Sequence, residues 1–224
     1  MEEDGLELRA APGFVQADVR EEFPGLRLDW ITVRGGRRAS SPELVQRLRA
    51  LSNRYRGSGV VAMRTQPIPH AYRAFFRHIG LDPDVTRIPS EQVAVARLLH
   101  GRLRSRDRVS DALLIALVET GVPVWALDAE FVGPGGLGIR TTVEGDRLGS
   151  GQRSESLVPG ALAVADEGRV HAMLFGEVAT EHAVSSRTNN IALYAVGVPG
   201  VPAIHVEEAL WTCAQALGDP RAGP

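Results

Sequence analysis

The sequence of 224 residues contains no lysine, so every one of its 25 basic residues is an arginine. Schiff-base enzymes, Walker-type nucleotide sites and protein kinases each need a lysine ammonium group on a flexible stem. All three chemistries are therefore excluded. Codon usage in a GC-rich genome accounts for such a bias, and the exclusion holds whatever its cause.

Cysteine and long apolar runs are also scarce. The single cysteine, Cys213, excludes an internal disulfide and indicates a reducing compartment. No apolar run approaches the roughly 18 residues that cross a membrane. The segment Met1–Asp4 is acidic, whereas a signal peptide begins with a basic region. We therefore expect a cytoplasmic protein with no membrane partner.

Metal, cofactor and serine-hydrolase motifs are missing too. The histidines are scattered without metal-ligand spacing, and no Gly-x-Ser-x-Gly motif occurs. Gly133–Gly138 fits Gly-x-Gly-x-x-Gly, but a dinucleotide site needs a helix after the third glycine. Here the β-branched segment Ile139–Val143 follows, which is typical of a strand. We expect neither a metal nor a cofactor, and we interpret the glycines as a connection.

Charge is unevenly distributed, although the net charge is only −2. That value argues against a protein covered by nucleic acid. The stretch 87–108 is nevertheless rich in arginine, and a second basic cluster spans Arg34–Arg38. Such a stretch forms either a solvated helix face or a patch that contacts phosphate transiently. The candidate phosphate-binding residues are Arg97, Arg102, Arg104, Arg106 and Arg108.

Hydrophobic periodicity predicts strands at Phe14–Val19 and Leu26–Val33. Capping residues and 3.6-residue spacing then predict a series of helices. The first helix opens at Ser41, and the second covers Ala71–Ile79. A third runs from a Ser90 cap to His100, and a fourth runs from a Ser110 cap to Glu119. The last helix covers Ile204–Leu217, with Leu210, Cys213 and Leu217 facing inward. Short strands and glycine turns dominate from Val124 onward.

These patterns predict one α+β domain over residues 1–224, with a β-rich core flanked by helices from both ends. We expect four strands to lie in one connected β core. They are Ile139–Val143, Ala161–Ala165, Val170–Phe175 and Ile191–Val196. We further expect Gly57–Gly59 to end the helix that opens at Ser41, and the tail after Gly218 to be disordered.

Three segments follow one another in a characteristic order: Gly121–Asp128 (Gly-Val-Pro-Val-Trp-Ala-Leu-Asp), Gly138–Asp146 and Gly160–Asp166, followed by Thr188-Asn189-Asn190. This order resembles the B3/B4 module of the phenylalanyl-tRNA synthetase β subunit. Upstream, Tyr72-Arg73, Gly80–Pro83 and Ile88–Glu91 resemble freestanding B3/B4 proteins. The resemblance covers roughly residues 71–204.

The resemblance implies a B3/B4-type core, sandwich-like and in three layers. It also implies a site for an aminoacyl ester, because the synthetase module removes wrong amino acids from tRNA. The function expected from it is a freestanding aminoacyl-tRNA deacylase that binds tRNA transiently. The alternative is a non-catalytic module that binds an amino-acid-like or aminoacyl ligand. In the deacylase reading, the arginines of residues 97–108 receive tRNA phosphate.

The polar loop from Gly176 to Thr188 is the candidate site, because polar loops between buried strands concentrate function. Anchoring the resemblance on Val184 and Thr188 places Glu181 and His182 near the family's recognition glutamate. The resemblance thus implies catalytic roles for Glu181, His182 and Thr188, and substrate contacts from Glu177 and Asn189. A solvated loop with incidental charges is the alternative.

Two further residues are singled out by the resemblance. Trp125 stands where the family carries a pocket-lining histidine, so we expect its ring to line a tighter and more apolar pocket. The alternative is that Trp125 merely fills the core. Arg140 lies on a strand before the Gly145-Asp146 turn and is a candidate substrate-binding residue. We expect it to pair with Asp128 or Asp166, as an arginine on a half-buried strand usually pairs with a carboxylate.

Overall fold

The computed structural model describes residues 9–54, 63, 65–151 and 154–218, and over this part of the chain it is an α+β fold with six helices and two β-sheets. The four-stranded sheet has the order β1-β3-β10-β4 and is antiparallel throughout. Its strands are β1 (Ala11–Pro12), β3 (Arg27–Arg34), β10 (Asn190–Gly197) and β4 (Val124–Asp128). Tyr194 of the central strand β10 pairs with Trp30 on one side and Trp125 on the other.

The second sheet has six short strands in the order β2-β5-β8-β9-β6-β7. They are β2 (Phe14–Val15), β5 (Gly138–Thr141), β8 (Leu162–Ala165), β9 (Val170–Met173), β6 (Arg147–Leu148) and β7 (Glu155–Ser156). The antiparallel strands β5, β8 and β9 form its centre, and a register shift interrupts the β8–β9 pairing after Val164. A 3₁₀ turn, η1 (Ala129–Phe131), leads out of β4 toward this sheet.

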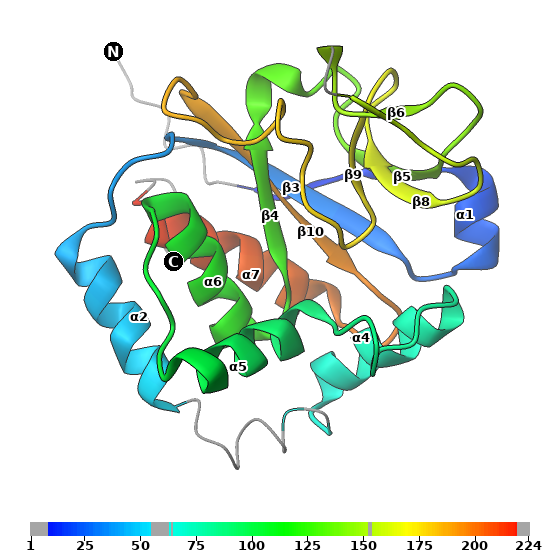
Figure 1. Ribbon diagram of the computed structural model, residues 1–224. Helices are drawn as coiled ribbons and strands as arrows, with labels where there is room; N and C mark the ends of the chain where they lie inside the picture. The colour runs from blue at the N-terminus through cyan, green and yellow to red at the C-terminus, as the bar shows by residue number, and fades with distance from the viewer. Residues whose placement is uncertain (1–8, 55–62, 64, 152–153, 219–224) are drawn as a thin grey trace.

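The helices pack mainly around the four-stranded sheet (Figure 1). They are α1 (Ala17–Glu22), α2 (Pro42–Arg54), α4 (Pro67–His78), α5 (Pro89–His100), α6 (Arg108–Thr120) and α7 (Ala203–Ala216). A Cβ built on Gly197 would lie 3.0 Å from Val206 of α7, whereas one built on Gly136, just before β5, would meet the Trp30 ring at 3.0 Å. The four-stranded sheet therefore lies between the C-terminal helix and the segment that leads into the six-stranded sheet.

The helix predictions hold better in their spans than in their caps. The helix that opens after Ser41 and the inward face of α7 are confirmed, and Cys213 is completely buried. Gly121 ends α6 with a φ of 77°, a conformation that glycine adopts without strain. The prediction that Ser110 caps α6 is wrong. Asp107 caps α6 instead, because its carboxylate accepts hydrogen bonds from the N–H groups of Val109 and Ser110.

Two other predictions of local structure need correction. Ser90 is not a cap but lies inside the first turn of α5, which begins at Pro89 after Ile88. The predicted strand Phe14–Val19 stops at Val15, and α1 follows. Val19 and Phe23 are both buried and one helical turn apart, so a helix places both side chains in the core.

The four strands expected in one connected β core are divided between the sheets. Three of them form β5, β8 and β9, while Ile191–Val196 belongs to β10 in the other sheet. One buried cluster still joins them, since it contains Ile139, Val164, Ala172 and Ile191. Shared burial, rather than strand pairing, connects the two sheets.

Two expectations fall on residues that the structure does not describe, namely the Gly57–Gly59 helix end and the tail after Gly218. Within the described residues, no helix has the length and apolar character needed to span a membrane.

An ion pair holds helix α4 to helix α5: the Arg73 guanidinium donates two hydrogen bonds to Glu91, of 2.8 and 3.0 Å. Both side chains are buried, and Arg73 also contacts Asp84 at 2.8 Å.

Candidate functional site

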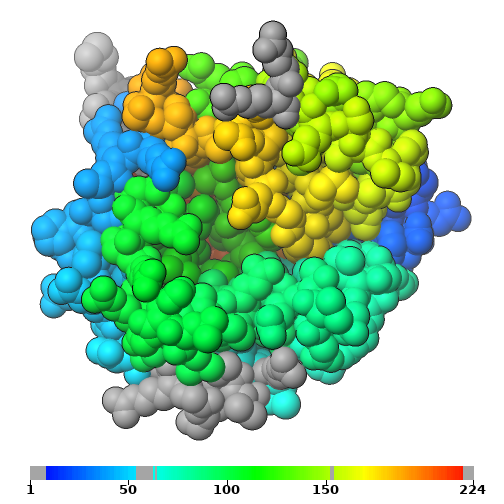
Figure 2. Space-filling view, viewed as in Figure 1, coloured from blue at the N-terminus to red at the C-terminus, as the bar shows by residue number. Residues whose placement is uncertain are grey.

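The main candidate site is a cavity of about 570 Å³ beside strand β4, here called the β4 cavity. Figure 2 shows a hollow at this place, between the α5–α6 region and the loop that precedes β10. Helices α5 and α6 form one wall, and residues 175–178 with 183–184 form the other. The volume lies in the usual range for a small-molecule site.

The position of β4 at the end of its sheet produces this cavity. Strand β4 pairs with β10 on one side only. On its other side the loop makes a single bridge, between Leu127 and Ala183, and the Asp128 N–H donates to the His182 carbonyl at 2.9 Å. The remainder of β4, from Val124 to Ala126, lines the cavity. The loop thus closes one end of the strand edge and leaves the other end to the cavity.

Aromatic rings form the apolar part of the β4 cavity. Trp125 is half-buried and stacks on the buried Tyr194, with ring centroids 5.6 Å apart and planes at 11°. Phe175 lies 6.0 Å from Trp125 and 5.0 Å from Phe76. Trp125 lines this cavity, but neither Glu181 nor Thr188, the residues expected to share its pocket, lines it.

Phe175 is a non-glycine residue with a positive φ, 62°. This left-handed conformation costs a bulky side chain free energy, and such strain is retained only where the surroundings impose it. The rings of Tyr72, Phe75, Phe76 and Trp125 all pack around Phe175. Their packing holds a strained residue in the cavity wall.

Three charged residues line the β4 cavity: Arg37, Asp107 and Glu177. Arg37 Nε lies 3.2 Å from Asp107 Oδ2. Burial alone would raise the pKa of Asp107, but the hydrogen bonds from Ser110 and the charge of Arg37 outweigh it and lower that pKa. Glu177 is exposed. It is thus the carboxylate that is available to a ligand.

The basic cluster Arg34–Arg38 is fixed next to the cavity by backbone hydrogen bonds. The Arg37 N–H donates to Ser185 O at 3.0 Å, and the Gly35 N–H donates to Asn189 O at 2.9 Å. A Cβ on Gly36 would lie 2.2 Å from Thr188 O, so only glycine fits there. The basic character of this cluster is visible in the sequence. Its place beside the cavity is not, because it depends on the contact of this cluster with the loop before β10 in the folded protein.

Thr188, predicted to be catalytic, has a structural position. Its hydroxyl donates to Asp128 Oδ2 at 2.6 Å and accepts from the Ser185 N–H at 3.0 Å. The side chain is buried and does not line the β4 cavity. Asn189, a predicted substrate contact, is exposed and uses its carbonyl to hold the basic cluster. Both residues fasten the end of the loop to β4.

Glu181 and His182, the other predicted catalytic residues, also lie outside the β4 cavity. His182 is completely buried, and its ring packs 4.7 Å from Phe131. Glu181 lies against Gly149, where an added Cβ would meet its carboxylate oxygen at 2.8 Å. Of the polar loop residues predicted for the site, Glu177 shares a cavity with Trp125 and these two do not.

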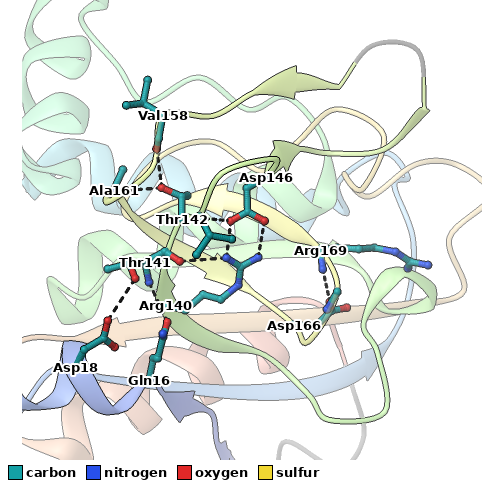
Figure 3. A network of polar contacts seen from close by, with 12 residues as sticks. Gln16, Asp18, Arg140, Thr141, Thr142, Asp146, Val158, Ala161, Asp166 and Arg169 are labelled. Atoms are coloured by element: carbon teal, nitrogen blue, oxygen red, sulfur yellow. Dashed lines mark hydrogen bonds and ion pairs between the residues drawn. The ribbon is translucent and has the colours of Figure 1, made fainter.

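Arg140 pairs with a carboxylate, but the predicted partner is wrong. Its guanidinium donates to both carboxylate oxygens of Asp146, at 2.5 and 2.9 Å, and not to Asp128 or Asp166 (Figure 3). The hydrogen bonds from Arg140 lower the pKa of Asp146, and Asp146 also accepts from the Val143 N–H at 2.8 Å. This pair closes the turn between β5 and β6, which explains why a local partner is used.

The arginines predicted to contact phosphate fall into two groups. Arg97 donates to Ser52 O at 3.0 Å, and Arg108 donates to Leu217 O, so both hold elements together. Arg102, Arg104 and Arg106 are exposed. They border a second pocket of about 310 Å³, which shares Val93, Ser110 and Leu114 with the β4 cavity. The exposed arginines therefore lie next to the candidate site.

No family model matches the chain, and a search of curated proteins finds no match either. Within the described residues, no group of three or more His, Cys, Asp or Glu side chains converges as a metal ion would require. The glycine-rich segment Gly133–Gly138 leads directly into β5, so it lacks the helix that a dinucleotide site needs. The candidate site therefore has to be judged by its own geometry.

Proposed function

We propose that the β4 cavity binds the aminoacyl end of a charged tRNA, and that the protein is a freestanding deacylase of the B3/B4 type. The observation that carries this proposal is the presence of Trp125 and Glu177 in one cavity. An aminoacyl ester offers an apolar or aromatic side chain next to an α-ammonium group. The Trp125 ring suits the first, and the Glu177 carboxylate suits the second.

The residue assignment differs from the one expected from the sequence. Aligned on Val184 and Thr188, the resemblance makes Glu181 the recognition glutamate. Glu177 follows Phe175-Gly176 directly and borders the cavity, so we assign this role to Glu177. Arg37 lines the β4 cavity, and three further arginines line the adjoining pocket, so these side chains suit the phosphates of a tRNA acceptor end. The three are Arg102, Arg104 and Arg106.

Hydrolysis in this cavity requires little from the protein. An aminoacyl ester is already activated, so a site needs to hold the ester, admit one water and stabilise the developing oxyanion. Glu177 is the cavity residue that can orient water, and a ribose hydroxyl of the substrate can assist. Apolar packing by Trp125 and Phe175 limits access of bulk water to the ester.

A second function is favoured by one feature of the cavity. Among its described lining residues there is no histidine, and Asp107 is already paired with Arg37. A cavity with Glu177 as its one available carboxylate suits recognition better than proton transfer. A non-catalytic module that binds an amino-acid-like or aminoacyl ligand is therefore the alternative proposal.

Release of free amino acid from a panel of mischarged tRNAs tests the proposal. We expect Glu177→Gln and Trp125→Ala each to lower single-turnover deacylation by about 10²-fold, as loss of one positioned group typically does. Glu144→Gln, at an exposed turn residue, is the matched control and should keep the parent rate.

Two outcomes would change the proposal. Loss of deacylation in Glu181→Gln with normal rates in Glu177→Gln would move the site away from the β4 cavity. If the parent protein deacylates no tRNA, but binds a free amino acid in a manner that depends on Trp125 and Glu177, the binding module is correct and the deacylase is rejected.

A further inference from the structure

A second polar cluster lies in and beside the six-stranded sheet, and none of its side chains lines the β4 cavity. It is a chain of four side chains, Asp166, His171, His182 and Ser150, here called the histidine chain. His171 Nδ1 lies 3.0 Å from His182 Nδ1, and His182 Nε2 lies 3.2 Å from Ser150 Oγ. At the inner end, His171 Nε2 is 3.3 Å from Asp166 Oδ2.

Asp166 is fixed in place as an anion. Its Oδ1 accepts from the N–H groups of Gly168 and Arg169, both at 2.8 Å, and its Oδ2 accepts from the Gly133 N–H at 2.9 Å. Burial tends to raise the pKa of Asp166, but these hydrogen bonds and the nearby His171 lower it. The carboxylate is therefore charged and cannot turn away from His171.

The two histidines are neutral, and only one arrangement of their protons satisfies the chain. Burial lowers the pKa of His171 to about 4 and also lowers the pKa of His182. A proton on His171 Nε2 faces the Asp166 carboxylate at 3.3 Å, which is an electrostatic contact without a hydrogen bond. His171 Nδ1 then accepts from His182 Nδ1–H, and His182 Nε2 is left as an acceptor for the Ser150 hydroxyl.

Ser150 is the solvent-facing end of this chain. It is half-buried, whereas both histidines are completely buried. The backbone reaches this position through Gly149, which has a φ of 78° and leaves no room for a side chain between Glu181 and Ala179. A serine hydroxyl that is bonded to a neutral, oriented imidazole has the arrangement of an activated nucleophile.

We propose that Ser150 is the nucleophile of an acyl-transfer site for small carboxylic esters, with His182 as its general base. His171 and Asp166 are positioning residues that hold His182 in the reactive tautomer. This site is separate from the β4 cavity and does not depend on the function proposed for that cavity.

The reaction proceeds in two steps. Ser150 Oγ attacks the ester carbonyl carbon while its proton passes to His182 Nε2. The imidazolium returns that proton to the departing alcohol, and an acyl-Ser150 ester remains. Water then attacks the acyl carbon, gives one proton to His182, and releases the carboxylic acid as Ser150 regains its hydrogen. No oxidant, metal or further reactant is needed.

A fluorophosphonate probe tests the nucleophile without any tRNA, because Ser150 Oγ would displace fluoride from phosphorus and form a stable adduct. We expect peptide mapping to find the adduct on Ser150 and p-nitrophenyl acetate to be hydrolysed. Ser150→Ala should abolish both. Ser186→Ala, at an exposed serine of the neighbouring loop, is the control and should alter neither. His182→Gln should slow labelling by about 10²-fold or more, the contribution of a general base.

The positioning role of His171 needs a readout beyond rate. The charged groups near His182 are Arg169, Glu181 and Asp166, and Asp166 also contacts His171. In His171→Gln, the pH profile of labelling should shift relative to the parent profile while the fold is retained by circular dichroism. An unchanged profile would remove His171 from the proposal. Failure of the folded parent protein to label at Ser150, or equal labelling in Ser150→Ala, would overturn it entirely.

Discussion

The β4 cavity and the histidine chain use the same loop in opposite ways. Glu177, Ala183 and Val184 face the cavity, whereas His182 points into the six-stranded sheet. The cavity is open and apolar with one available carboxylate, and the chain is buried and polar with a single serine near solvent. These differences support two separate proposals, an aminoacyl site with one carboxylate in the cavity and a serine nucleophile at the end of the chain. Neighbouring residues of a loop can serve two sites because the loop is fixed to two sheets, through Leu127 and Ala172.

The largest expected effect concerns the wall of the β4 cavity. Arg73→Ala removes one partner of the buried pair with Glu91 and should lower the free energy of unfolding by about 3–5 kcal/mol. Chemical denaturation measures this loss. The control, Arg77→Ala, removes an exposed arginine of the same helix and should change stability by less than about 0.5 kcal/mol.

The same variant sharpens the comparison between the two regions. Helix α5 borders the cavity but not the histidine chain, so ligand binding should weaken in folded Arg73→Ala while Ser150 labelling persists. Equal loss of both activities would show that the two regions are not independent.

A smaller effect on the free energy of unfolding is expected from the histidine chain, and this effect depends on pH. The pKa of His171 is about 4 in the folded protein and about 6.5 when unfolded, so between these values the unfolded chain binds a proton that the folded chain does not. Stability should therefore fall as the pH drops from about 6.5 to 4, by roughly 3 kcal/mol, and His171 should contribute no further loss below that range.

Thermal or chemical unfolding across this pH range measures the effect. His171→Gln should show a weaker dependence than the parent protein, although His182 continues to contribute in the same direction. His70→Gln, at an exposed histidine, should keep the parent dependence. An identical slope in the parent and His171→Gln would mean that His171 is not buried as a neutral side chain.

The smallest effect is expected at the exposed arginines beside the cavity. Arg104→Ala should reduce the slope of tRNA affinity against salt by about one unit while leaving the deacylation rate of bound substrate unchanged. Arg20→Ala, far along the chain at an exposed position of α1, should leave the slope as it is. A parent protein whose tRNA affinity shows no salt dependence would exclude this phosphate-binding patch.

Much of the local structure was determined by the sequence. The helical spans of α2, α4, α6 and α7 follow from apolar spacing, and the stop at Gly121 follows from the conformational freedom of glycine. Strand composition also located β5, β8, β9 and β10. The expectation that Trp125 lines a pocket rests on the resemblance, in which it stands at the position of a pocket-lining histidine, and the structure places it in the wall of the β4 cavity.

Only the tertiary structure decided how these pieces meet. The division of β10 from β9, the choice of Asp146 by Arg140, and the separation of Glu177 from His182 all depend on which strands pair. Sequence spacing on a loop fixes the order of side chains but not the face on which each one emerges. The loop crosses between two sheets, so residues five apart lie in different sites, and the contact of His182 with His171 and Ser150 arises only once the strands are in register.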